Sequence, residues 1–228
     1  MANIRAILFD AAGKLLHVHP SVGEVYAREA ERFGVRVSAD TVNSAFRSAW
    51  RAMRPYADGK TPFHTSEEIE RAWWRNLVER VFDGACGPDA FAERFDVFFE
   101  SLYLRFEQPD VWRLFDDVMP TLEALQSRGI PIAIVSNWDS RLPRLLRAMG
   151  IADRCQFILT SAEAGVSKPS PEIFHQALAR LALPPHEVLH IGDSLEDDVH
   201  AAKRAGLQSV HICRTGTTNS DGPSIRSL

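Results

Sequence analysis

The stretch IRAILFD, residues 4–10, decides how the chain is expected to fold. The run from Ile4 to Phe9 is mostly apolar and is too short for a typical helix. Its Ile, Leu and Phe content favours a strand that is buried in a sheet. The run ends in an acid, Asp10, so we expect a carboxylate at the carboxyl end of this strand.

Similar apolar runs recur in the second half of the chain and alternate with helical patterns. Glycines follow three of these patterns, at the position where a left-handed C-terminal cap is common. Continuous apolar strands that alternate with helices are typical of a parallel sheet with helices on both faces, so we predict an α/β fold. The expected strands span residues 130–135, 157–159, 188–191 and 209–212, and the expected helices span residues 120–128, 141–149, 171–181 and 197–205.

Residues 17–109 break this alternation because they show only helical patterns. Loops at the carboxyl ends of parallel strands surround the ligand site, so an insert there can close over a ligand. We therefore expect a core made of residues 1–16 and 110–228 and a helical-bundle cap made of residues 17–109. Residues 214–228 are rich in Gly, Ser and Thr and are expected to form a loop or a loose tail. The expected cap helices span residues 21–33, 39–53, 66–82 and 89–106.

Composition restricts the classes of partner. The 228 residues are 45% apolar and 25% charged, with a net charge of −4, which argues against a nucleic-acid-binding surface. No apolar run approaches the roughly 18 residues that a membrane-spanning helix needs. The separated cysteines Cys86, Cys155 and Cys213 suggest neither a disulfide framework nor a zinc site. We expect a cytoplasmic protein, and the sequence does not indicate its oligomeric state.

Polar residues stand where the expected strands end. Asp10, the pair Ser136 and Asn137, and Asp193 each follow a strand, and parallel strands bring such residues to one edge of the sheet. Lys168 precedes a helix and could reach the same edge. Aspartate can attack an electrophile, lysine offers a point charge, and Ser136 and Asn137 offer donors for oxyanions.

The acidic residues also predict a metal site. Asp193 with Asp197 or Asp198 would repel Asp10 unless a cation lies between them, and hard oxygen ligands suit Mg²⁺. Each acid has an ordinary structural alternative as well. Asp10 could be only a cap or turn residue, and Asp197 or Asp198 could simply complement a helix dipole. The four polar segments together, in this order on this topology, favour an active site.

These segments, around a helical insert, resemble the haloacid dehalogenase (HAD) superfamily. The most specific stretches are IVSN at 134–137, SAEAGVSKPSPEIF at 161–174 and HIGDSLEDDVHAAKRAGL at 190–207. The resemblance spans nearly the whole chain. It implies a Rossmann-like core, an aspartyl nucleophile, Mg²⁺, and a four-helix cap that closes over a small organic substrate.

The resemblance assigns roles to individual residues. It makes Asp10 both the nucleophile and a metal ligand, with the backbone carbonyl of Ala12 and the carboxylate of Asp193 as further ligands. Asp198 matches the acid that holds metal-bound water, with Asp197 as the alternative.

Two further roles concern the transferred group. Ser136 matches the hydroxyl that binds a phosphoryl oxygen, and Lys168 matches the lysine that steadies the charge. Asn137 stands beside Ser136 as a further expected phosphate-binding residue.

The first motif departs from the family pattern. Phosphatases of this family usually read Asp-x-Asp-Gly-Thr, whereas this chain has Ala12 and Lys14 where the second Asp and the Thr would stand. The missing acid would protonate the leaving group, a contribution of typically about 10²–10⁴ in rate. His17 or His19 could replace it. Lys14 could place a cation near Asp10 or point to solvent.

Three functional hypotheses follow. The first is a Mg²⁺-dependent HAD-like hydrolase that forms an aspartyl intermediate with a small phosphorylated metabolite. The second is a fold that has lost efficient turnover and binds a ligand or partner. The third is a hydrolase of the dehalogenase or phosphonoacetaldehyde hydrolase type, because neither needs the missing acid; the latter type would use a cap lysine, for which Lys60 is the candidate.

Overall fold

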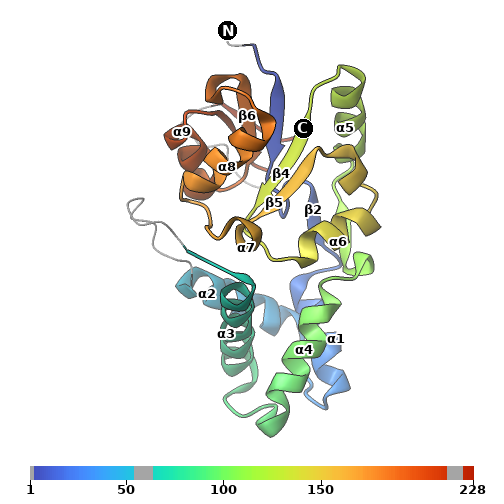
Figure 1. The fold of residues 1–228 in the computed structure, drawn as a ribbon. Helices are drawn as coiled ribbons and strands as arrows, with labels where there is room; N and C mark the ends of the chain where they lie inside the picture. Colours follow the sequence, from blue (N-terminus) through green and yellow to red (C-terminus); the bar gives the residue numbers. More distant parts are fainter. Residues whose placement is uncertain (1–2, 54–63, 215–222) are drawn as a thin grey trace. The chain divides into compact units, whose positions relative to one another are not determined.

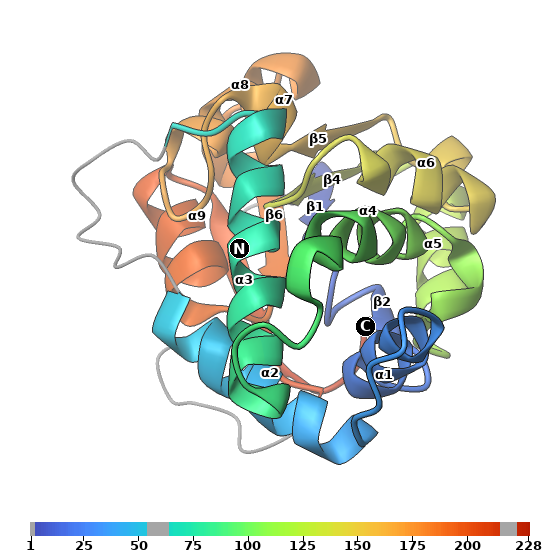
Figure 2. The same cartoon turned by 90° about the horizontal axis from the view of Figure 1, so that it is seen from below.

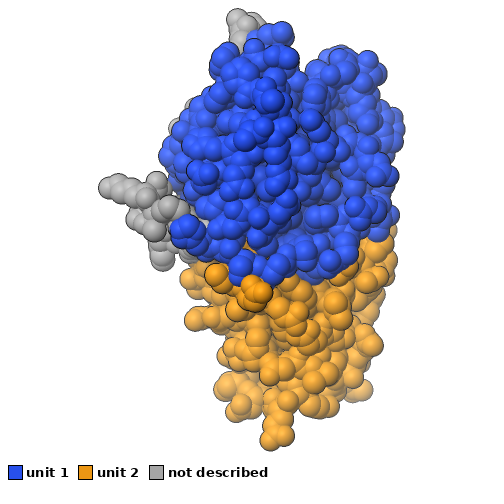
Figure 3. All heavy atoms as spheres, in the orientation of Figure 1, with its two compact units in different colours: residues 1–17, 57–67, 114–228 blue, residues 18–56, 68–113 orange. Residues whose placement is uncertain are grey.

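The computed structural model describes residues 3–53, 64–214 and 223–228 and separates into two compact units (Figure 3). Unit 1 comprises residues 1–17, 57–67 and 114–228, and unit 2 comprises residues 18–56 and 68–113. The chain therefore leaves unit 1 soon after its first strand, rejoins it over the described residues 64–67, and returns to it from residue 114 for the remaining strands.

Unit 1 contains a six-stranded parallel sheet with the order β5-β4-β1-β6-β7-β8 (Figure 1). All four residues of β1 are buried, which explains its unbroken apolar sequence. Ile7 of β1 lies opposite Ile132 of β4 and Leu189 of β6, so the first strand is interior to the sheet. The strands are β1 Ala6–Phe9, β4 Ile132–Ser136, β5 Phe157–Thr160, β6 Val188–Gly192, β7 Gln208–Ile212 and β8 Ser224–Ile225.

Helices cover both faces of this sheet. One core cluster joins Leu8 and Val135 of the sheet to Phe174 of α8 and Ala202 of α9. Figure 1 shows α5 and α6 on the opposite face. The helices are α5 Val118–Ser127, α6 Arg141–Ala148, α7 Ser161–Ala164, α8 Glu172–Leu181 and α9 Ala201–Arg204. The predicted Rossmann-like α/β fold is confirmed.

Unit 2 contains helices (Figure 2), and their aromatic side chains pack against one another. Phe91 stacks on Phe98 with the ring centroids 4.0 Å apart, and Phe82 meets both rings edge-on at 5.0 Å. These phenylalanines are buried, so they serve packing. The helices are α1 Val22–Arg32, α2 Ala39–Met53, α3 Glu67–Cys86 and α4 Phe95–Arg105. Among the described residues, no helix is both long and apolar enough to cross a membrane.

Some short elements differ from the sequence-based expectation. β2 Leu16–Val18 and β3 Trp112–Leu114 form a two-stranded sheet. The prediction of a loop or loose tail at residues 214–228 is wrong for the described part of the C-terminal segment, because β8 pairs with β7. The backbone N–H of Leu228 also donates to Asp117 at 2.8 Å. Strands of two or three residues are too short to leave a periodic pattern.

Candidate active site

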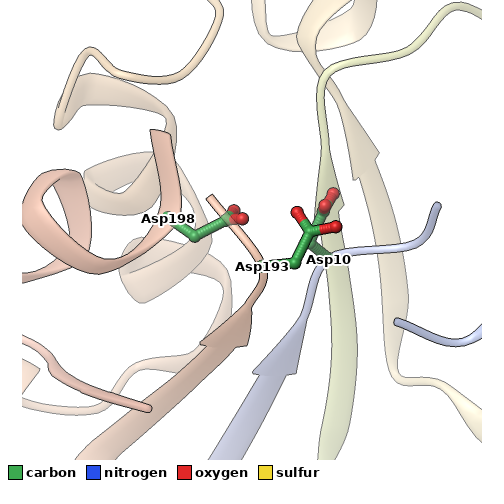
Figure 4. A group of neighbouring side chains, drawn as sticks. All are labelled: Asp10, Asp193 and Asp198. Carbon is green, nitrogen blue, oxygen red and sulfur yellow. The ribbon is translucent and has the colours of Figure 1, made fainter. Parts of the chain in front are cut away.

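The carboxyl ends of three neighbouring strands meet at one edge of the sheet. Asp10 directly follows β1, Ser136 is the last residue of β4, and Asp193 directly follows β6. The sheet order reverses direction at β1, where ligands usually bind in open α/β sheets. Figure 4 shows the carboxylates of Asp10, Asp193 and Asp198 gathered at this edge. The structure therefore brings together acids that are up to 188 positions apart in the chain (Asp10 to Asp198).

Asp10 is buried and lies between two ammonium groups. Its backbone N–H donates to the carbonyl of Ile191 at 3.0 Å, which fixes the start of the loop against β6. One carboxylate oxygen lies 3.0 Å from Nζ of Lys168, and the other contacts Nζ of Lys14. Burial opposes ionisation, but the two positive charges outweigh it and hold the pKa of Asp10 below its usual value. Asp10 is therefore an ionised carboxylate, as a nucleophile must be.

Lys168 joins Asp10 to Asp198. Its Nζ lies 2.6 Å from Oδ1 of Asp198, and its side chain is buried. Asn137 fixes the backbone of this residue from both sides: the Asn137 amide donates to the Lys168 carbonyl at 2.8 Å and accepts from the Lys168 N–H at 2.7 Å. The side-chain amide that was expected to bind phosphate thus holds the lysine in place.

The structure distinguishes Asp198 from Asp197. Asp198 is 1% exposed, and its Oδ2 accepts the N–H of Ser194 at 3.0 Å. Asp197 instead accepts the hydroxyl of Ser194 at 2.9 Å, at the start of the helix. A Cβ on Gly192 would lie 2.1 Å from Cγ of Asp198, so only glycine leaves room for this carboxylate. Burial opposes ionisation of Asp198, but Lys168 and then Lys14 hold its pKa well below the usual value.

His190 is a site residue that the sequence reasoning missed. It is fully buried on β6, and its Nε2 lies 3.1 Å from Oδ1 of Asp198. Burial lowers the pKa of His190, so a neutral ring donates a hydrogen bond from Nε2 to the carboxylate. A histidine inside an apolar strand was the available signal, but the sequence does not show which neighbour it meets.

Lys14 occupies the centre of the acidic group. Its Nζ contacts the carboxylate of Asp10, lies 2.7 Å from Oδ1 of Asp193 and lies 3.9 Å from Oδ2 of Asp198. The residue is only 4% exposed, so of the two positions open from the sequence it takes the one beside Asp10. Burial disfavours the charged form, yet the three acids raise the pKa of Lys14 above its usual value, and the ammonium stays charged.

The backbone of Lys14 is held from outside the loop. Arg214 donates to the Lys14 carbonyl from Nε at 3.0 Å and from Nη2 at 2.6 Å, and it pairs with Asp117 at 2.8 Å. Gly13 has φ +80°, and a Cβ there would lie 2.5 Å from an oxygen of Asp193. The loop therefore needs glycine before the lysine. Nothing in the sequence indicated that Arg214, at the start of the expected tail, supports the first motif.

Two further predicted residues lie at the same edge. Ser136 is 3% exposed at the end of β4. Ala12 is partly buried and pairs through its backbone with Leu16. A methyl side chain can neither donate nor accept a proton, so Ala12 supplies no general acid.

The donor set suits a divalent cation, but its centre already holds a charge. Carboxylate oxygens of Asp10, Asp193 and Asp198 lie within 4.8 Å of one another, and Mg²⁺ prefers such hard ligands. Mg²⁺ needs oxygen atoms at about 2.0–2.1 Å in octahedral geometry. The ammonium of Lys14 contacts these same acids, so Mg²⁺ and Lys14 do not fit together at this place.

The candidates for a replacement acid, His17 and His19, each contact neighbouring residues. The ring of His17 lies against Phe115 with the centroids 4.8 Å apart. The backbone N–H of His19 donates to the carbonyl of Val111 at 2.8 Å. Lys60 lies outside the described residues.

The chain is similar to known proteins in both sequence and fold. The sequence profile described as haloacid dehalogenase-like hydrolase matches residues 4–206. The chain is 36% identical over 212 residues to haloacid dehalogenase-like hydrolase domain-containing protein 3 of Danio rerio, covering 92% of this chain and 86% of that protein. A HAD phosphatase from Thermococcus onnurineus superimposes with a TM-score of 0.68 at 25% identity, covering 98% and 94% of the two chains. The magnesium-bound HAD-hydrolase YfnB of Bacillus subtilis shares the fold with a TM-score of 0.69 at 21% identity, covering 99% and 96%.

Proposed function

The chain belongs to the haloacid dehalogenase-like hydrolases, and from this premise we propose that it hydrolyses a small phosphorylated metabolite through an aspartyl intermediate on Asp10. The observation that supports this best is the state of Asp10. It is buried, ionised and aligned by Lys168 at the carboxyl end of an interior strand. The separated cysteines Cys86, Cys155 and Cys213 favour the cytoplasm as its location.

The proposed reaction has two displacements at phosphorus. In the first, an oxygen of Asp10 forms a bond to phosphorus while the bond to the leaving-group oxygen breaks. The hydroxyl of Ser136 donates to a phosphoryl oxygen, and Lys168 offsets negative charge. In the second, water attacks the aspartyl phosphate, phosphate leaves, and the carboxylate of Asp10 is regenerated with loss of a proton to solvent.

Ala12 restricts the substrate class. An acid at this position would protonate the departing oxygen, which is worth about 10²–10⁴ in rate, or roughly 3–5 kcal/mol of barrier. Without it, the leaving group must depart as a stable anion. We therefore infer a preference for activated phosphates, such as acyl, enol or aryl phosphates, over simple alkyl phosphates.

HAD hydrolases generally use Mg²⁺, and a structural neighbour is bound to magnesium. In this chain the ligands would be the carboxylates of Asp10, Asp193 and Asp198 and the carbonyl of Ala12. When bound, the ion would supply positive charge beside the transferred phosphoryl group. The contacts of Lys14 conflict with that placement, so the proposed steps use only residues of the chain.

A substrate panel tests this function. Acetyl phosphate, p-nitrophenyl phosphate and a simple alkyl phosphate are incubated with the wild-type protein and with Asp10→Asn, and released phosphate is measured. We expect turnover of the activated substrates that disappears in the variant. Turnover that survives in Asp10→Asn would contradict the assigned nucleophile.

A second candidate is a protein that binds a ligand without turning it over. The observation that favours it is the pairing of Asp10 with two lysines, because ion pairing lowers the availability of a nucleophile. The same panel discriminates the two: turnover of any substrate that depends on Asp10 would exclude the binding-only function.

Halide release from a 2-haloacid, measured beside the panel, tests the dehalogenase alternative. Phosphonoacetaldehyde added to the panel tests the hydrolase type that would use Lys60.

A further inference from the structure

The charges at the sheet edge are nearly balanced without any added ion. Asp10, Asp193 and Asp198 contribute three carboxylates, and Lys14 and Lys168 contribute two ammonium groups that contact them. A buried group of acids is unfavourable unless cations lie among them. Here the chain itself supplies those cations.

Lys14 is the cation that lies among all three acids. Lys168 contacts Asp10 and Asp198, whereas Lys14 also reaches Asp193, the acid at the end of β6. Lys14 and Asp10 are four residues apart in one loop, so the lysine returns directly to the acid that precedes it. Its ammonium is shielded from solvent, and hydrogen bonds from Arg214 fix its carbonyl.

A divalent ion would compete directly with this ammonium. Both need the same carboxylate oxygens, and two cations at one contact distance repel each other strongly in a partly buried site. The Lys14 ammonium carries one positive charge instead of the two of a divalent ion, and it cannot bind ligands by coordination. It donates hydrogen bonds that orient the carboxylates. The chain can thus pair and align its three acids without a metal.

We propose that Lys14 is a tethered cation that takes the place of the divalent metal among Asp10, Asp193 and Asp198. The protein therefore binds Mg²⁺ or Mn²⁺ at these carboxylates only when Lys14 is removed. This inference rests on the geometry of the acids and not on the proposed hydrolysis, and its test needs no substrate.

The test is a Mn²⁺ titration of untagged protein, followed by the electron paramagnetic resonance signal of free Mn²⁺. The samples are wild type, Asp193→Asn, Lys14→Met, and Lys14→Met combined with Asp193→Asn. Lys203→Met, which removes an exposed lysine of α9, is the matched control. We expect Lys14→Met to bind Mn²⁺ about a hundredfold or more tightly than wild type. The added Asp193→Asn should abolish that gain, and Lys203→Met should match wild type.

Two outcomes would overturn the proposal. One is tight Mn²⁺ binding by the wild type that Asp193→Asn removes, which would show that the metal enters with Lys14 in place. The comparison of wild type with Asp193→Asn needs no substitution of Lys14, so it tests the proposal even if Lys14→Met fails to fold. The other is a folded Lys14→Met protein that binds no Mn²⁺, which would show that the acids are no metal site.

Discussion

Lys168→Met should destabilise the protein strongly, because it removes a buried cation and keeps a side chain of similar length. Lys168 is 3% exposed and lies 3.0 Å from Asp10 and 2.6 Å from Asp198. Breaking a buried ion pair by removing one partner costs about 3–5 kcal/mol. For a chain of this length, each kcal/mol shifts the melting temperature by about 2–4 °C, so we expect a loss of about 6–20 °C at pH 7.

The loss should depend on pH in a defined direction. The pKa values of Asp10 and Asp198 are lowered in the folded protein by neighbouring lysines, against the effect of burial. Their pairing therefore stabilises the fold above the unfolded pKa of about 3.9 and is lost as pH falls through the lower folded values. Without Lys168 these acids take up protons at higher pH, which relieves the unpaired charge. The gap between wild type and variant should be widest near pH 7 and should narrow toward pH 4.

Thermal unfolding followed by tryptophan fluorescence at pH 7 and pH 4 measures both effects. Lys203→Met is the control, because an exposed substitution should stay within about 0.5 kcal/mol of wild type. A Lys168→Met variant that matches this control at pH 7, or whose loss of melting temperature is the same at both pH values, would show that Lys168 does not stabilise the fold by pairing with these acids.

Four other substitutions probe the proposed site and its missing acid. Gly192→Ala should displace Asp198, because the new Cβ would lie 2.1 Å from the Cγ of Asp198. We expect loss of turnover and a lower melting temperature. Unchanged kinetics would contradict the position of Asp198 in the site. Ala12→Asp should restore a proton donor and raise turnover of a simple alkyl phosphate by about 10²–10⁴ relative to an aryl phosphate. Steady-state assays measure the ratio of the two turnover rates. An unchanged ratio would mean that protonation of the leaving group does not limit the rate. His17→Ala and His19→Ala test whether either ring replaces the missing acid. Loss of a histidine that plays no part in the reaction leaves the rate on an alkyl phosphate unchanged. A tenfold loss of rate in one variant would identify the proton donor.

The sheet could be predicted because its strands are continuous apolar runs. A strand that is buried on both faces has apolar residues throughout instead of alternating apolar and polar residues. Strand β1, directly before Asp10, is the clearest example. The pairs β2 with β3 and β7 with β8 were not predicted, because their shortest members have only two or three residues.

The site could be predicted only in part. Residues at the ends of β1, β4 and β6 meet because parallel strands align their carboxyl ends. This convergence could be predicted from the sequence once the strands were recognised. The choice between Asp197 and Asp198 could not be made, because the helix begins with a π-helical turn at Leu195–His200. Such a turn holds more residues than the α-helical period assumes, so side-chain directions shift.

The contacts of Lys14 could not be predicted from the sequence. A lysine four residues after Asp10 can equally point to solvent, and its burial depends on Gly13 and on Arg214 from the far end of the chain. Contacts over such a separation leave no local pattern. His190 was missed for the same reason, because its partner Asp198 lies across the strand end.

In the proposed reaction Asp10 carries the phosphoryl group during turnover. Rapid acid quenching of the protein with acetyl phosphate, followed by mass spectrometry of its peptides, tests this directly. We expect a phosphoryl adduct on the peptide that contains Asp10, absent in Asp10→Asn. Steady phosphate release with no adduct on that peptide, or with an adduct on another residue, would contradict the account.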